Sequence, residues 1–107
     1  MPRRRPLAIA PEVADLIRVL APNAKRKMRE AIEAIREDPT IGSELVRELS
    51  GLRRLRVGQL RVVYRVASRH VQVIAIGPRA TIYVDLEARQ RRGESREPPR
   101  MFRTSDP

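Results

Sequence analysis

The chain has 107 residues, of which 41% are hydrophobic and 3% aromatic, so it can form one small domain with an aliphatic core. Its 23 lysines and arginines outnumber 13 acidic residues and give a net charge of +10, which favours a polyanionic partner, either nucleic acid or an acidic protein. Cysteine is absent, which excludes disulfides, thiolate metal sites and a cysteine nucleophile. The apolar run at residues 7–10 is too short for a signal peptide or a membrane span. We therefore expect a soluble, cytoplasmic protein.

The N-terminal half predicts one short strand followed by two helices. Residues 1–5 form a basic tail, and residues 7–10 are a candidate strand. Pro11 suits the first turn of a helix, which we expect to end at Pro22. Asn23 is the expected N-cap of a second helix running to about Glu37. Because the loop between them is short, the two helices predict an antiparallel αα-hairpin.

The second predicted helix has one apolar and one charged face. Its apolar stripe is Ala24, Met28, Ala31, Ile32 and Ile35. Its other face carries Lys25, Arg26, Arg29, Glu30, Glu33 and Arg36. Since these charges are of both signs, we expect a solvated face.

Residues 52–65, LRRLRVGQLRVVYR, are the most strand-like stretch and hold five arginines and no acidic residue. Gly58-Gln59 predicts a two-residue turn of type II′. Folding the stretch about this turn pairs Arg56 with Arg61, and Arg54 with Val63. Paired residues share a face, so Leu55, Val57, Leu60, Val62, Tyr64 and Val66 form an apolar face. The opposite face carries Arg54, Arg56, Arg61 and Arg65, with Val63 among them.

A third strand is expected over residues 71–76, after a turn at Ser68-Arg69. Simple alternation places Val71, Val73 and Ala75 on the apolar face, and Ile74 and Ile76 on the arginine face. Antiparallel pairing returns the end of this strand to Arg61, so Arg79 and Tyr83 are expected to join the arginines.

The C-terminal part of the chain predicts less regular structure. Residues 80–91 predict a helix, with a short strand around Thr81, Ile82 and Val84 as the alternative. Residues 92–107 are rich in proline and charge and predict a disordered tail.

The pairing of Arg56 with Arg61 is informative because directly opposed like charges cost about 0.2–1 kcal/mol in a sheet. That repulsion becomes useful if an anion lies between the two side chains. The alternative is a solvated strand face on which arginine stems cover apolar surface. For Tyr83, the alternative to a functional role is packing in the core.

These segments resemble one known family. An αα-hairpin ending in EDP, then LSGLRRLRVGQLRVVYRV, then HVQVIAIGPRATIY resembles the RelE/ParE superfamily of bacterial type II toxins, and its RelE branch, over roughly residues 7–90. The resemblance implies an α+β fold in which an N-terminal αα-hairpin packs on a small, mainly antiparallel β-sheet. It implies a single domain at residues 6–91, between the basic tail at 1–5 and the tail at 92–107.

RelE-like toxins cut mRNA in the ribosomal A site by attack of a ribose 2′-hydroxyl on the adjacent phosphate. The resemblance implies that Arg54, Arg61, Arg79 and Tyr83 are catalytic, and that Arg53, Arg56 and Arg65 bind RNA. The sequence has no metal-ligand spacing, and we expect no cofactor and no metal. The implied partners are a cognate acidic antitoxin, in a toxin–antitoxin hetero-oligomer, and the ribosome with its mRNA; no membrane is implied.

The chain departs from the RelE pattern at several positions. A well-known RelE pattern has lysine near Arg54 and Arg56, Pro78 stands where many relatives have histidine, and Leu60 stands where many have tyrosine. Because arginine is not deprotonated at ordinary pH, Tyr83 is the remaining candidate for proton transfer. The alternative function is that of a ParE-like toxin, which is not an enzyme and inhibits DNA gyrase by binding it.

Overall fold

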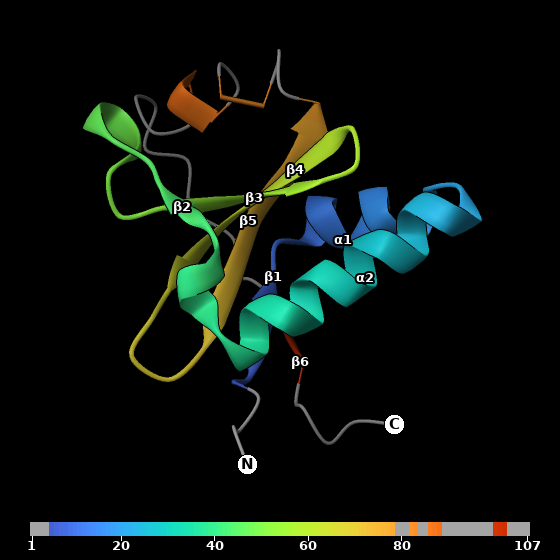
Figure 1. The fold of residues 1–107 in the computed structure, drawn as a ribbon, viewed down its shortest axis with the longest axis horizontal. Helices are drawn as coiled ribbons and strands as arrows, with labels where there is room; N and C mark the ends of the chain where they lie inside the picture. Colours follow the sequence, from blue (N-terminus) through green and yellow to red (C-terminus); the bar gives the residue numbers. More distant parts are fainter. Residues whose placement is uncertain (1–4, 79–81, 84–85, 89–99, 103–107) are drawn as a thin grey trace.

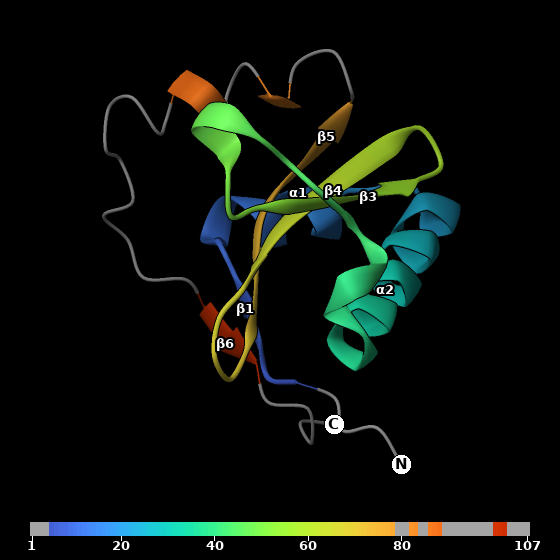
Figure 2. The same ribbon diagram turned by 60° about the vertical axis from the view of Figure 1, so that its left-hand side comes forward.

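The computed structural model of the protein describes residues 5–78, 82–83, 86–88 and 100–102 (Figure 1). In chain order the elements are β1 (Leu7–Ile9), α1 (Pro11–Arg18), α2 (Pro22–Glu37), the 3-10 helix η1 (Pro39–Ile41), β2 (Ser43–Glu44), the 3-10 helix η2 (Arg47–Leu49), β3 (Arg53–Val57), β4 (Leu60–Val66), β5 (Val71–Pro78) and β6 (Arg100–Phe102). The sheet order is β2-β3-β4-β5-β1-β6. Strands β1 and β5 are parallel, and all other neighbours are antiparallel. The helical hairpin packs on this sheet, which is the predicted α+β fold (Figures 1 and 2).

Both helices begin with a proline. Pro11 and Pro22 each occupy the first turn, where a fixed φ suits the helix and a missing N–H costs nothing. The prediction that Asn23 caps the second helix is therefore wrong, since the N-cap is Ala21 and it makes no side-chain capping bond. The first helix ends at Arg18, before the predicted boundary.

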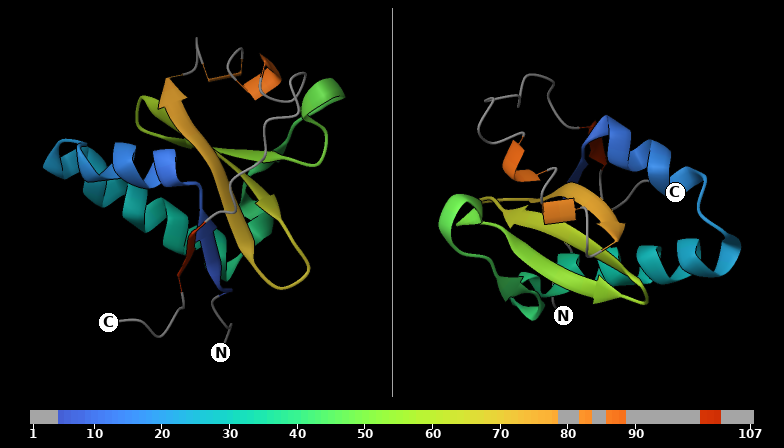
Figure 3. Two further views of the ribbon diagram at one scale, coloured as in Figure 1. Left: turned by 180° about the vertical axis from the view of Figure 1, so that it is seen from behind. Right: turned by 90° about the horizontal axis from the view of Figure 1, so that it is seen from above.

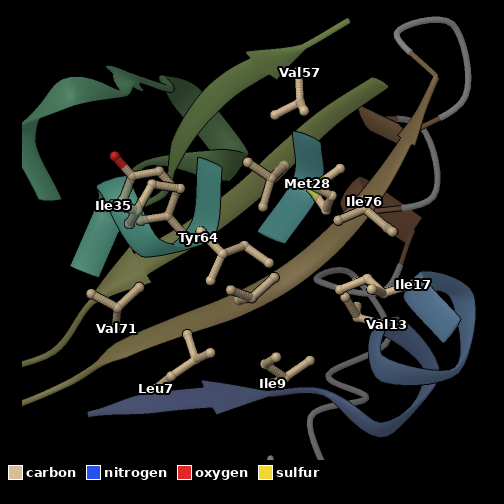
Figure 4. Close-up of a cluster of buried hydrophobic side chains, with 13 residues drawn as sticks. Leu7, Ile9, Val13, Ile17, Met28, Ile35, Val57, Tyr64, Val71 and Ile76 are labelled. Carbon is tan, nitrogen blue, oxygen red and sulfur yellow. The ribbon is translucent and has the colours of Figure 1, made fainter. Parts of the chain in front are cut away.

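The main core lies between the helical hairpin and the sheet (Figure 4). It is aliphatic apart from Met28 and Tyr64, and its buried members are Leu7, Ile9, Val13, Ile17, Met28, Ile32, Ile35, Val57, Val62, Tyr64, Val71, Val73 and Ile76. The predicted apolar stripe of α2 supplies three of them. Figure 4 shows the hydroxyl oxygen of Tyr64 at the margin of this cluster rather than within it.

Arg36 is buried, although the sequence placed it on the solvated face of α2. Its Nε donates to the carbonyl oxygen of Arg5 at 2.9 Å, and its Nη1 pairs with Glu33 at 2.8 Å. The backbone N–H of Arg5 donates in turn to the carbonyl of Arg36 at 3.2 Å. These partners, together with the favourable position of a cation in the last turn of a helix, offset part of the cost of burying this arginine, whose Nη2 makes no hydrogen bond to a described residue.

The β3–β4 hairpin has the predicted register. Val57 pairs with Leu60, Arg56 with Arg61, and Arg54 with Val63. Gly58 has a φ of 63°, the left-handed conformation that the turn requires of its first central residue.

Strand β5 departs from the predicted register at Ile74. Val63 pairs with Ala75 and Tyr64 with Val73, so Ile74 has no partner and forms a β-bulge. Beyond the bulge the side chains change faces. Ile76 enters the main core and Ala75 lies on the opposite face, which reverses the prediction for both residues. The reason is burial, since an isoleucine removes more apolar surface from water in the main core than an alanine does.

A second, smaller core covers the opposite face of the sheet. Its buried members are Leu49, Leu52, Val63, Ala75, Ile82 and Leu86. Residues 82–83 and 86–88 are helical, as predicted for this part of the chain. In Figure 1 this C-terminal segment lies at the top of the view, away from α1 and α2.

Residues 100–102 form β6, so the predicted disorder is wrong for these residues. Strand β6 pairs with β1, with Leu7 opposite Phe102 and Ile9 opposite Arg100 (Figure 3). Without it, β1 would present an edge of unpaired backbone groups. The rest of the predicted C-terminal tail, and residues 1–4 of the basic tail, lie outside the described residues.

Candidate functional site

Arg56 and Arg61 lie directly opposite each other on β3 and β4, on the sheet face away from the helical hairpin. Arg56 is exposed and Arg61 is half-buried. The Nε of Arg56 donates to the carbonyl of Gly58 at 3.4 Å. Among the residues that the structure describes, no carboxylate forms an ion pair with either guanidinium.

Arg54 lies on the same face, two residues before Arg56 along β3. Its Nη1 donates to the hydroxyl of Tyr83 in a long hydrogen bond of 3.4 Å. Both side chains are half-buried. The structure thus brings together Arg54 and Tyr83, which are 29 residues apart in the chain, next to the Arg56–Arg61 pair. In the described part of the chain, Arg54 also has no carboxylate partner.

Tyr83 reaches Arg54 because the preceding residue is anchored in the second core. Ile82 is 4% exposed and Leu86 is 1% exposed, whereas Tyr83 packs against the margin of that core. Tyr83 therefore packs against the second core and also contacts Arg54, while its functional role stays a prediction.

Two of the predicted RNA-binding residues lie apart from this cluster. Arg53 pairs with Tyr64 and so lies on the other face of the sheet, where it donates to the carbonyl of Gly42 at 2.7 Å and pairs with Glu44 at 3.3 Å. Strict alternation along the strand was a sequence signal for this placement. Arg65 is exposed on the arginine face, but buried Val63 separates it from Arg61 along β4.

Arg79, one of the predicted catalytic residues, lies outside the described residues. Strand β5 does return to Arg61 as predicted, since Arg61 pairs with Gly77.

Tyr64 fixes the backbone behind the cluster, which the sequence did not reveal. Its hydroxyl donates to the carbonyl of Pro39 at 2.6 Å and accepts from the N–H of Gly42 at 2.9 Å. Burial raises the pKa of this phenol, while the Gly42 N–H and the charge of Arg53 oppose the rise. No local pattern connects residues 22 positions apart, so only the folded chain shows this bond.

The described residues contain no group of three or more His, Cys, Asp or Glu side chains that could hold a metal ion. No helix in the described part of the chain is long and apolar enough to cross a membrane. The groups that the structure brings together at the candidate site are the guanidiniums of Arg54, Arg56 and Arg61 and the phenol of Tyr83.

Comparison with known proteins identifies the family. The family model described as the ParE toxin of the type II toxin–antitoxin system parDE matches residues 9–83, well over half of the chain. The chain belongs to this toxin family. It is thus a toxin of a type II toxin–antitoxin system, within the RelE/ParE superfamily that the sequence resembled.

Solved structures of similar fold are also toxins. A mutant of the Escherichia coli toxin RelE in the free state is 22% identical with a TM-score of 0.66, and the match covers 83% of this chain and 98% of that one. The toxin–antitoxin complex RelBE2 from Mycobacterium tuberculosis is 23% identical with a TM-score of 0.63, covering 72% and 93%. An archaeal RelE–RelB complex from Pyrococcus horikoshii is 24% identical with a TM-score of 0.58, covering 75% and 98%. A search among curated proteins found no match. At these identities the structures support the fold alone.

Proposed function

We propose that this toxin is a ribosome-dependent mRNA endoribonuclease that inhibits translation in the cytoplasm. The observation that carries the proposal is the Arg54–Tyr83 contact beside the opposed Arg56–Arg61 pair. Guanidinium groups that no carboxylate among the described residues neutralises remain available to an RNA phosphate.

The chemistry suits attack by a ribose 2′-hydroxyl on the adjacent phosphate. The O2′–P bond forms, the P–O5′ bond breaks, and the products are a cyclic phosphate and a 5′-hydroxyl. Negative charge develops on the non-bridging oxygens, where Arg54 and Arg61 would stabilise it together with Arg79. Arginine cannot accept the proton of the 2′-hydroxyl, so Tyr83, held by Arg54, is the side chain placed to take part in proton transfer.

Because the residues that the structure describes bring no strong base to this cluster, we expect the ribosome to orient the substrate and complete the site. Arg56 and Arg65 would contact the RNA backbone, giving binding that weakens with salt. A 2′-hydroxyl nucleophile restricts the substrate to RNA. Arg53 is assigned no RNA contact here, since its guanidinium is bound to Gly42 and Glu44.

The proposed partner that controls this activity is a cognate acidic antitoxin that covers the arginines. The net charge of +10 and the exposed arginine face favour an acidic partner. Two of the similar solved structures are toxin–antitoxin complexes. A toxin–antitoxin hetero-oligomer is therefore the expected inactive form.

Inhibition of DNA gyrase is the second candidate, because the matching family model is named for ParE. A gyrase inhibitor needs a binding surface but no convergent Arg–Tyr pair. The two functions share one fold, and fold by itself does not distinguish them.

One experiment separates the two candidates. The toxin is expressed briefly, and mRNA ends on translating ribosomes are mapped for the parent, for Arg54→Ala and for Arg69→Ala, an exposed arginine at the β4–β5 turn that serves as a matched control. We expect A-site cuts with the parent and the control, and cutting reduced about 10²–10³-fold with Arg54→Ala. Intact mRNA together with gyrase stalled on broken DNA would contradict the nuclease and support the gyrase inhibitor.

A further inference from the structure

The bulge at Ile74 decides which side chains of β5 lie under the C-terminal segment. After the bulge, Ala75 faces Val63 and Gly77 faces Arg61 on the arginine side of the sheet. Both residues are small. The end of β5 therefore has no bulky side chain on the arginine side, next to Arg61.

Without the bulge, the same strand would present large side chains at this place. A slip of one residue moves every side chain to the other face. Simple alternation from Val71 would put Ile76 and Pro78 on the arginine side, and Ala75 and Gly77 toward the helices. Because of the bulge, Ala75 and Gly77 lie on the arginine side instead, and Ile76 and Pro78 lie on the side of the helices.

The C-terminal segment uses the space above Gly77. A Cβ placed on Gly77 would lie 3.6 Å from the Cβ of Ile82 and 3.9 Å from its Cδ1, which are ordinary van der Waals distances. An alanine fits there, but the branches of a larger side chain would meet Ile82. Because Ile82 is buried and Tyr83 follows it directly, a displacement of Ile82 would also move the Tyr83 hydroxyl, which lies 3.4 Å from Nη1 of Arg54.

We infer that the bulge at Ile74 and the side-chain-free position at Gly77 position Tyr83 against Arg54. They are positioning residues, since they act through Ile82 and contact no substrate. The inference rests on the proposed nuclease function only for its effect on cleavage. The placement of Tyr83 can be tested without any activity.

The test uses a graded pair of variants at one position. Gly77→Ala adds a methyl group that the structure accommodates, and Gly77→Val adds branches that it does not. Gly77 does not have a positive φ, and valine is favoured in strands, so neither backbone strain nor strand propensity accounts for a difference between them. Ile82→Ala removes the anchor without adding volume, and Ile82→Val is its conservative counterpart.

The first measurement follows the contact itself by NMR. The chain has two tyrosines, so tyrosine labelled with 13C at Cζ gives two signals, and buried Tyr64 reports an intact main core. We expect Arg54→Ala to move the Tyr83 signal in the parent, Gly77→Ala and Ile82→Val backgrounds, and to leave it in place in Gly77→Val and Ile82→Ala. If Gly77→Val does not fold, the two Ile82 variants decide. A Tyr83 signal that still responds to Arg54→Ala in Gly77→Val or in Ile82→Ala would overturn the inference.

The second measurement is mRNA cleavage on ribosomes. For Gly77→Val we expect kcat to fall about a hundredfold, the order expected when a catalytic group is misplaced by about 1 Å, with KM changed by less than about twofold. A rise in KM with kcat unchanged would contradict a positioning role. If the parent itself does not cut mRNA, the proposed function fails, and the NMR result by itself supports or overturns the positioning of Tyr83.

Discussion

Tyr64 and Gly42 are joined by a hydrogen bond in which the N–H of Gly42 donates to the tyrosine hydroxyl at 2.9 Å. The same hydroxyl donates to the carbonyl of Pro39 at 2.6 Å. Together the two bonds connect residues 39–42, which precede β2, to β4 near the centre of the sheet. They also place Gly42 against the backbone of Arg54, so the main core supports the strand that carries the arginines.

Tyr64→Phe is expected to lower the free energy of unfolding by about 1–3 kcal/mol, because it leaves the buried Gly42 N–H without its acceptor. Urea unfolding measures the change. The matched control is Tyr83→Phe, the same substitution at a half-buried position that loses only a long bond to Arg54. Equal losses in the two variants would contradict the role given to the Tyr64 hydroxyl.

The raised pKa of Tyr64 predicts a loss of stability in alkali. Burial is the largest cause, and the ordinary value is 10.0. Below pH 10 the phenol is protonated in both the folded and unfolded states, so its contribution is fully present. Above pH 10 the unfolded chain releases this proton while the folded chain retains it, and stability falls until the folded pKa is passed. The parent should therefore lose stability more steeply above pH 10 than Tyr64→Phe does in urea titrations; parallel curves would contradict this.

Gly42→Ala is expected to destabilise the fold by about 1–3 kcal/mol through overpacking. Its Cβ would lie 2.7 Å from the carbonyl oxygen of Arg54 and would overlap the Tyr64 hydroxyl. Gly42 has a φ of −83°, so the cost is steric rather than conformational. Thermal unfolding tests it, with Ser43→Ala, an exposed neighbour, as the control that should change little.

Arg56→Gln is expected to stabilise the isolated toxin while weakening its binding to RNA. Removing one of two directly opposed charges should raise the free energy of unfolding by about 0.2–1 kcal/mol. Loss of one phosphate contact should reduce the salt slope of RNA binding by about 1. Arg69→Gln is the control, with the same change of charge at the exposed β4–β5 turn. A salt slope that the Arg56 variant leaves unchanged would remove Arg56 from the binding surface.

Arg53 and Arg54 are adjacent in the chain, but we expect Arg53 to affect stability and Arg54 to affect cleavage. Arg53→Ala loses the bonds to Gly42 and Glu44 and should cost about 1 kcal/mol of stability, with cleavage of mRNA unchanged. Arg54→Ala should leave stability nearly unchanged and lower kcat about 10²–10³-fold, as expected for removal of one transition-state donor. Unfolding and ribosome cleavage assays on both variants test the distinction, which fails if both lose activity equally.

Short-range patterns were sufficient for much of the fold. Alternation about the Gly58 turn gave the register of the β3–β4 hairpin residue by residue, and the helical spacing of Met28, Ile32 and Ile35 identified the buried stripe of α2. The opposition of Arg56 and Arg61 follows from that register and so was readable in the sequence. These features depend on residues close together in the chain, where backbone periodicity dictates the geometry.

Other features were decided by competition between distant parts of the chain. The bulge at Ile74 forms because an isoleucine rather than an alanine then enters the main core, a choice that depends on the helices packed there. Arg36 is buried because Arg5 supplies its acceptor, and Tyr64 finds its partners in a loop that precedes β2. The sequence by itself therefore determined β1, the two helices, strands β3 to β5, the hairpin register and the charged face, but not β6. Tertiary structure decided the second half of β5, the burial of Arg36 and the approach of Tyr83 to Arg54, because each depends on which long-range contacts remove the most apolar surface from water while satisfying buried polar groups.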